Sequence, residues 1–203
     1  MTRTWAAAEI DVAAATTIDG RTVERHGTGE VAIDKGYADI DWTTATSHAH
    51  ELVNDHAIFT QDEAPDGVWV RTESGGRTPT SAFANPLLHL TDLRDVAPDG
   101  TGEMDGFEAV RYRGTLPVTA ADLEGLAVDD DTVNRIVAAA DADDAIVVTV
   151  WVDPHHRAAR IDRSLDIAGP DPITATATTH LTNFGVMLDL ESPPSASVTA
   201  PRP

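Results

Sequence analysis

Histidines are the residues of this sequence that come closest to a metal site. His48 and His50 lie two positions apart, so a strand would direct both imidazoles to one face, and His56 follows a short turn. Three imidazoles are ligands that zinc accepts. The alternative is a hairpin with exposed polar side chains. We favour the hairpin. The His-Glu pair at 50–51 is also not a helical zinc-protease motif, because residue 54 is not a histidine.

Two further polar patterns have weaker chemical meaning. The segment Asp-Pro-His-His at 153–156 is a turn, and its adjacent histidines point in different directions, which disfavours a metal or pH-sensing site. The acidic runs 129–131 and 141–144 lack the alternating ligands, central glycine and terminal glutamate of a calcium loop. We interpret them as solvated flanks of helices. The sequence therefore predicts no metal and no cofactor.

Catalytic motifs are missing from the sequence. It contains no Gly-x-Ser-x-Gly elbow, P-loop or dinucleotide-binding glycine pattern, and no local arrangement would activate a serine. We therefore predict that the protein is not an enzyme and has no catalytic residue. Arg163 is unusual because it interrupts an inward apolar series between Ile161 and Leu165. It either lies at the mouth of a cavity, facing a ligand headgroup or an acidic side chain, or a bulge turns it to solvent.

Composition excludes several classes of function. The chain has 203 residues, no cysteine, 34 acidic and 14 basic side chains, and a formal net charge of −20. This charge disfavours nucleic acid and anionic lipid surfaces as partners. The absence of cysteine excludes a disulfide scaffold and a cysteine nucleophile. No apolar run is long enough to span a membrane, and the start lacks a signal peptide. Either the protein is intracellular or Met1 replaces a removed export segment.

Period-two alternation of apolar residues dominates the chain and predicts strands with one buried face. Glycine-containing turns at 19–20 and 35–36 separate the first of them. The predicted strands cover 6–18, 22–34, 37–44, 48–53, 57–61, 68–72, 106–116, 146–152, 159–167 and 173–182. Helical spacing appears at 86–96, 120–125 and 131–140, the last with Asp131 or Thr132 as its cap.

These elements predict an α+β fold. Meandering strands without a β-α-β rhythm favour one large antiparallel sheet of about eight to eleven strands, which should twist and curl. The short helices are the candidates to cover its concave face. Because alanine, valine, threonine and isoleucine dominate the inward positions, an apolar cavity between sheet and helices is one expectation. The other is that helix side chains fill this space.

Motifs along the chain resemble the LolA-like lipoprotein carriers, in particular the actinobacterial branch that includes the mycobacterial LppX and LprG lipoproteins. The matching segments are Gly-Thr-Gly-Glu at 27–30, Gly-Val-Trp-Val at 67–70, Asn-Pro-Leu at 85–87, Gly-Phe-Glu at 106–108, Arg-Tyr-Arg-Gly-Thr at 111–115, Val-Trp-Val-Asp at 150–153, 157–161 and Leu-Thr-Asn-Phe-Gly at 181–185. Their order and spacing span about 185 residues, although none is a catalytic signature.

The resemblance implies a half-barrel of antiparallel strands closed by helices, with a hydrophobic cavity for acyl chains or a lipoprotein anchor. It also implies an extracytoplasmic location, with anchoring through a segment absent from this chain. Two departures are the lack of a lipid-bearing cysteine and of a helix before the first long strand. The second departure puts closure of the cavity in question.

Together, these observations predict a non-catalytic carrier of a lipid or acyl chain, formed by residues 1–191 as a single domain with a Pro-rich extended or disordered tail over 192–203. An acceptor protein or membrane component would receive the cargo. The residues expected to line the cavity are Ile10, Val12, Ile40, Trp42, Leu87, Leu90, Ile136, Val148, Val150, Ile161 and Leu165. One alternative is an envelope sensor or protein-interaction module that has a filled interior and binds through a sheet edge or lid surface. Another is metal storage by the three histidines.

Overall fold

The computed structural model describes residues 7–33, 35–54, 57–62, 67–73, 86–87, 89–123, 126, 128, 130–169, 171–186, 193 and 197–199. The chain forms two compact units. Unit 1 comprises 1–11, 25–86 and 181–203, and unit 2 comprises 12–24 and 87–180. The single domain expected over 1–191 stays a prediction.

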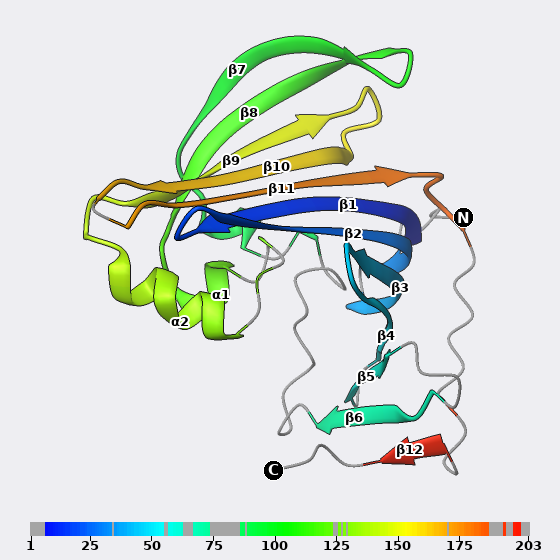
Figure 1. Ribbon diagram of the computed structural model, residues 1–203. Coiled ribbons are helices and arrows are strands. Elements are labelled where there is room, and N and C mark those ends of the chain that lie inside the picture. Colours follow the sequence, from blue (N-terminus) through cyan, green and yellow to red (C-terminus); the bar gives the residue numbers. More distant parts are fainter. Residues whose placement is uncertain are drawn as a thin grey trace. The chain divides into compact units, whose positions relative to one another are not determined.

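The strands form one open sheet in the order β12-β6-β5-β4-β3-β2-β1-β11-β10-β9-β8-β7 (Figure 1). Their bounds are β1 Ala7–Ile18, β2 Arg21–Ala32, β3 Tyr37–Thr44, β4 His48–Val53, β5 Ala57–Asp62, β6 Trp69–Glu73, β7 Arg94–Met104, β8 Phe107–Pro117, β9 Ala145–Val152, β10 Ala158–Ile167, β11 Ile173–Thr182 and β12 Val198–Thr199. The β12–β6 pair is parallel, and the meander neighbours described below are antiparallel. The predicted fold class is confirmed. The twelfth strand, which exceeds the expected range, has only two residues.

In unit 1, β2 to β6 form a meander whose register places small residues opposite large ones. Gly27 pairs with Trp42, and Gly29 pairs with Ile40. A Cβ at Gly27 would lie 2.6 Å from the Trp42 ring, so only glycine leaves room for the indole in this conformation. Trp42 and Ile40 are both buried. The Gly-Thr-Gly motif is therefore explained by packing against β3.

Unit 2 contains the antiparallel strands β7 to β10, their neighbour β11 and two helices, α1 (Ala120–Leu123) and α2 (Asp130–Ala139). Helix α2 begins one residue before the predicted range, so Asp131 and Thr132 lie inside its first turn rather than at its cap. Both helices contribute buried side chains, Leu123 from α1 and Ile136 from α2. Within the described part of the chain, no helix is long and apolar enough to cross a membrane.

The helix predicted over 86–96 is wrong. Among the described residues of this stretch, the one helical element is a 3-10 turn, η1 (Leu90–Asp92), and β7 begins at Arg94. His89, immediately before the turn, has φ 64°, a left-handed conformation that an α-helix cannot continue through. The spacing of Leu87, Leu90 and Leu93 matches the apolar face of a helix, but the left-handed backbone at His89 prevents a continuous α-helix.

Strand β7 was absent from the predicted elements, and its irregularity explains why. Its register with β8 shifts between Arg94 and Ala97 and again between Pro98 and Thr101. Asp95 and Gly100 have positive φ, 52° and 85°. Two such bulges destroy the strict alternation on which strand recognition depends.

Candidate functional site

The side of the unit 2 sheet that carries Val148 and Ile161 is here called the inner side. Paired residues in an antiparallel sheet point to the same side, so the register defines cross-strand rows. The first row runs Gly114, Val148, Arg163 and Ala177, and the second runs Tyr112, Val150, Ile161 and Thr179. Apart from Arg163, Tyr112 and Thr179, these rows consist of aliphatic residues and glycine. The inner side is therefore an apolar surface that also contains one cation.

Arg163 lies in the middle of the first row and is only 4% exposed. The ladder has no register shift at this residue, so the alternative that a bulge turns it to solvent is wrong. Removing the guanidinium from water lowers the pKa of Arg163 to about 10, so it remains charged at neutral pH. Its neighbours across the strands are Val148 and Ala177, and the small alanine leaves space for a long side chain.

On the inner side, the exposure of the side chains increases from β10 and β9 toward β8 and β7. Val148 and Ile161 are fully buried, whereas Tyr112 and Val110 on β8 are each 39% exposed, and Val96 on β7 is 53% exposed. Val110 pairs with the half-buried Val152. Val96 also lies on the inner side, because its Cγ2 is 3.1 Å from the place that a Cβ of Gly114 would occupy. These three exposed residues, Val96, Val110 and Tyr112, are called the apolar strip. Large exposed apolar side chains grouped on one side of a sheet suit an apolar ligand.

The predicted cavity residues divide between the two units. Ile10, Ile40 and Trp42 lie in unit 1, and all three are buried. The unit 2 members are Val12, Leu87, Leu90, Ile136, Val148, Val150, Ile161 and Leu165. Val150 and Ile161 are direct cross-strand partners on the inner side. Leu87 and Leu90 are half-buried; Leu87 precedes the 3-10 turn, and Leu90 is the first residue of that turn. Their role as cavity lining stays a prediction.

The contacts of Trp151 in unit 2 were not predicted from the sequence. On the opposite, outer side of the sheet, the Trp151 ring lies between two guanidinium groups, at 5.3 Å from Arg111 and 5.4 Å from Arg160. The indole nitrogen of Trp151 donates to Asp162, 2.8 Å away, and Asp162 also accepts a bond from Arg160. A Cβ at Gly102 would lie 2.7 Å from the ring. Cation–π contacts and a matching glycine thus fix this tryptophan on the outer side.

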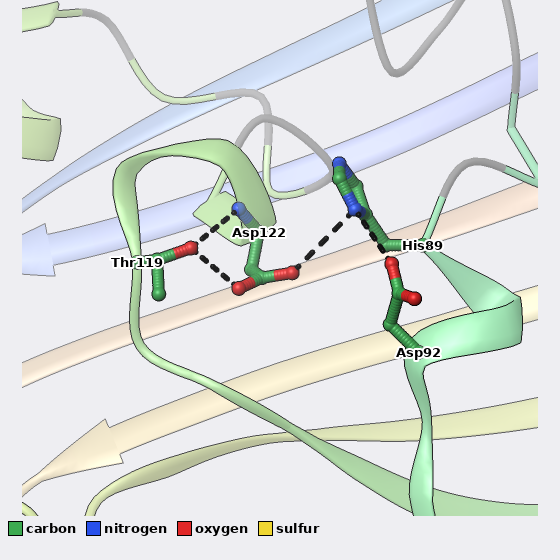
Figure 2. Close-up of polar contacts among 4 residues, drawn as sticks. All are labelled: His89, Asp92, Thr119 and Asp122. Carbon is green, nitrogen blue, oxygen red and sulfur yellow. Dashed lines mark hydrogen bonds and ion pairs between the residues drawn. The ribbon is translucent and has the colours of Figure 1, made fainter.

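A polar cluster connects the 3-10 turn to α1 (Figure 2). Thr119 caps α1, because its hydroxyl accepts the Asp122 amide at 3.2 Å and donates to the Asp122 carboxylate at 2.5 Å. His89 Nδ1 lies 3.3 Å from an Asp92 oxygen and 3.8 Å from an Asp122 oxygen. The Thr-x-x-Asp spacing is the sequence signal that could have located this cap. The cluster positions the two short insertions relative to each other.

The predicted histidine cluster is only partly described. His48 and His50 both lie on β4, whereas His56 is outside the described residues. His50 contacts Asp39 through Nε2 at 2.6 Å, and its ring centroid is 5.0 Å from that of Trp69. Among the residues that the structure describes, no group of three or more His, Asp or Glu side chains could hold a metal ion.

The Asp-Pro-His-His turn is organised by its aspartate. Asp153 is buried and accepts the backbone amides of His155 and Arg157 at 2.8 and 2.9 Å, as well as the Arg157 Nε at 2.6 Å. Burial by itself raises the pKa of Asp153, but these hydrogen bonds and the guanidinium charge outweigh it, and the pKa is lowered from its usual 3.8. His155 and His156 are exposed.

Replacement of this carboxylate, Asp153→Asn, is expected to cost about 2–3 kcal/mol at neutral pH, because a buried charge-assisted pair is broken. The pKa of Asp153 is lower in the folded protein than in the unfolded chain. The carboxylate therefore contributes its full stabilisation at pH values above the usual 3.8, and this stabilisation is lost as the pH falls through the pKa of the folded state. Urea unfolding of both proteins across this range should show the difference shrinking toward acid. A difference that stays constant down to the folded pKa would contradict it.

No known protein family matches the chain, and no curated protein does. Solved structures do match. The Mycobacterium tuberculosis lipoprotein LppX is 15% identical over 91% of this chain and 90% of its own, with a TM-score of 0.43. LprF from Mycobacterium bovis is 15% identical over 95% of this chain and 91% of its own, with a TM-score of 0.45. The MucA/MucB complex of Pseudomonas aeruginosa contains a chain that is 11% identical over 89% of this chain and 90% of its own, with a TM-score of 0.30.

LppX is a member of the branch that the sequence resembles. At these identities and TM-scores, no ligand or partner is transferred from these proteins to this chain.

Proposed function

We propose that this protein is a non-catalytic carrier that binds an acyl chain along the inner side of the unit 2 sheet. The observation that supports this best is the apolar strip. These three residues of β7 and β8 remain exposed, whereas Val148, Val150 and Ile161 on the inner side of β9 and β10 are buried. An acyl chain placed over the apolar strip would gain about 25 cal/mol for each Å² of apolar surface removed from water.

Arg163 adds a chemical preference to this proposal. It lies one row from Tyr112, on the same side of the sheet. A buried guanidinium interacts more favourably with a carboxylate or phosphate than with a neutral headgroup. The preferred cargo is therefore an amphiphile with apolar chains and an anionic end. The protein would act outside the cytoplasm, anchored to a membrane, and would pass its cargo to an acceptor protein or membrane component.

The experiment begins with the purified full chain. Native mass spectrometry followed by organic extraction should reveal a copurified acylated species, and a dansyl-labelled fatty acid should bind to protein from which it was removed. Val110→Asp should weaken that binding at least about tenfold, because a ligand chain would have to bury an unpaired carboxylate. The matched control is Val23→Asp, which changes a valine on β2 that is more exposed than Val110, 57% against 39%.

Three outcomes would count against the proposal. An empty protein that also ignores the labelled fatty acid would overturn the carrier function. Unchanged binding by the Val110→Asp protein would exclude the apolar strip as the site. Equal affinity for a fatty acid and the corresponding fatty alcohol would remove the anionic preference while leaving the carrier function intact.

The alternative function, an envelope sensor or interaction module, has one observation in its favour. A segment near the C-terminus pairs with the edge strand β6, which is the geometry in which sheet edges bind peptides.

A further inference from the structure

The edge of the unit 1 sheet at β6 is bound by a segment far along the chain. Val198 and Thr199 form β12, which pairs in parallel with Trp69 and Val70 (Figure 1). Parallel neighbours in a sheet are ordinarily joined by a compact crossover, but here the partner strand comes from the C-terminal region. The β6 edge therefore accepts a strand that is not its sequence neighbour.

Side-chain contacts add to the backbone pairing of β12 with β6. Val198 packs against a small apolar cluster formed by Ala57, Phe59 and Trp69, together with Leu52. The Thr199 hydroxyl donates to the Trp69 carbonyl oxygen at 3.4 Å. One aliphatic anchor and main-chain pairing are the two components by which sheet edges recognise extended peptides.

The intramolecular strand is short. In the described part of the chain, its ladder covers only the first two of the five residues of β6. Pro194 and Pro201 flank the paired residues, and proline has no amide hydrogen with which to extend a ladder. Parallel pairs are also slightly less stable than antiparallel ones. A longer strand without proline would make more contacts with the same edge.

We propose that the β6 edge is an acceptor site for an extended segment of another protein, and that this chain's own C-terminal segment occupies it until a competing strand displaces it. The partner segment carries a β-branched aliphatic residue at the position of Val198. Its charge is neutral or basic: the paired residues Val198 and Thr199 are uncharged, and the sequence 193–203 around them contains Arg202 as its single charged side chain, within a chain of net charge −20. A second copy of this acidic protein is a poor occupant, because the two copies repel each other.

The test uses a fluorescently labelled peptide with the sequence of 193–203 as the probe. Binding is measured by anisotropy to the full-length protein and to its Val198→Asp variant, in which the internal strand loses its anchor. The variant should bind the peptide at least about tenfold more tightly than the wild type, in which the tethered segment competes at an effective concentration in the millimolar range. Val23→Asp, on an exposed valine of β2, should behave as wild type.

Two further measurements make the result specific. Amides of β6 should gain protection from hydrogen exchange when the peptide binds, and a peptide with aspartate in place of the valine should not bind. Thr199→Pro is a second variant that releases the segment without adding charge; should Val198→Asp fail to fold, this variant carries the test.

Absence of peptide binding by a folded released variant would overturn the proposal, as would binding that leaves the β6 amides unprotected. A wild-type dimer that dissociates in the Val198→Asp variant would also overturn it, because the occupant would then be a second copy of this chain.

Discussion

Val148→Arg is expected to unfold unit 2. Val148 is fully buried, and its cross-strand partners are Gly114 and Arg163. The substitution would place a second guanidinium directly opposite the first, at a position that is fully buried in the wild type. Burial of an unpaired charge is among the few changes that cost more than about 4–5 kcal/mol. Loss of the cooperative thermal transition, followed by circular dichroism, is the expected observation.

The matched substitution is Val147→Arg, one residue earlier on β9. Val147 is half-buried on the outer side of the sheet, where it pairs with Thr115 and Ser164. An arginine there can extend toward solvent, so the loss of stability should be small. A folded Val148→Arg protein with normal stability would show that the inner side at this row has room for a long cation, contrary to the packing described above.

Gly29→Ala is expected to destabilise unit 1 by about 3 kcal/mol or more, which is at or above the usual cost of overpacking. A Cβ at this position would overlap the carbonyl oxygen of Asp39 and would lie 2.9 Å from the Ile40 Cα. These are backbone atoms of β3, so no side-chain rotation relieves the clash. The two strands must separate locally, and urea unfolding should record the loss.

Gly27→Ala provides the comparison for this prediction. Its Cβ would meet the Trp42 ring rather than the backbone, and the ring can turn away. The expected cost is therefore lower than at Gly29, with a change in tryptophan fluorescence as the indole moves. Thr28→Ala, at an exposed position between the two glycines, should have little effect. A reversed order of the two glycine variants would contradict the packing argument.

The regular strands could be predicted from the sequence because their alternation is strict. The bounds of β3, β4 and β11 agree with the predicted ranges, and β9 differs by one residue. Strand β7 could not be found in the same way, since bulges around Pro98 interrupt its pattern. The false helix over 86–96 has a related cause: leucine spacing is a local signal, whereas the left-handed His89 is set by the contacts of the folded chain.

The candidate site was predictable to a different degree. The period-two alternation of the sequence alone placed Arg163 among the inward-facing residues, and its burial confirms that position. The exposed state of Tyr112 and Val110 could not be inferred, because exposure depends on which elements cover a strand. The Trp151 contacts join β7, β8, β9 and β10, so no local pattern encodes them. Pairing of β12 with β6 could not be inferred either, because the sequence predicted only an extended or disordered tail over 192–203.

The irregularity of β7 also bears on solubility. An open sheet ends in two strands whose unpaired backbone groups can recruit further chains into aggregates, and β7 is one of them. Its two register shifts, the positive φ of Asp95 and the proline at 98 bend and interrupt that edge. A flat template for amyloid-like stacking is thereby removed. Straightening β7 by deleting its bulge residues would be a route to fibril formation, even in a chain that carries a net charge of −20.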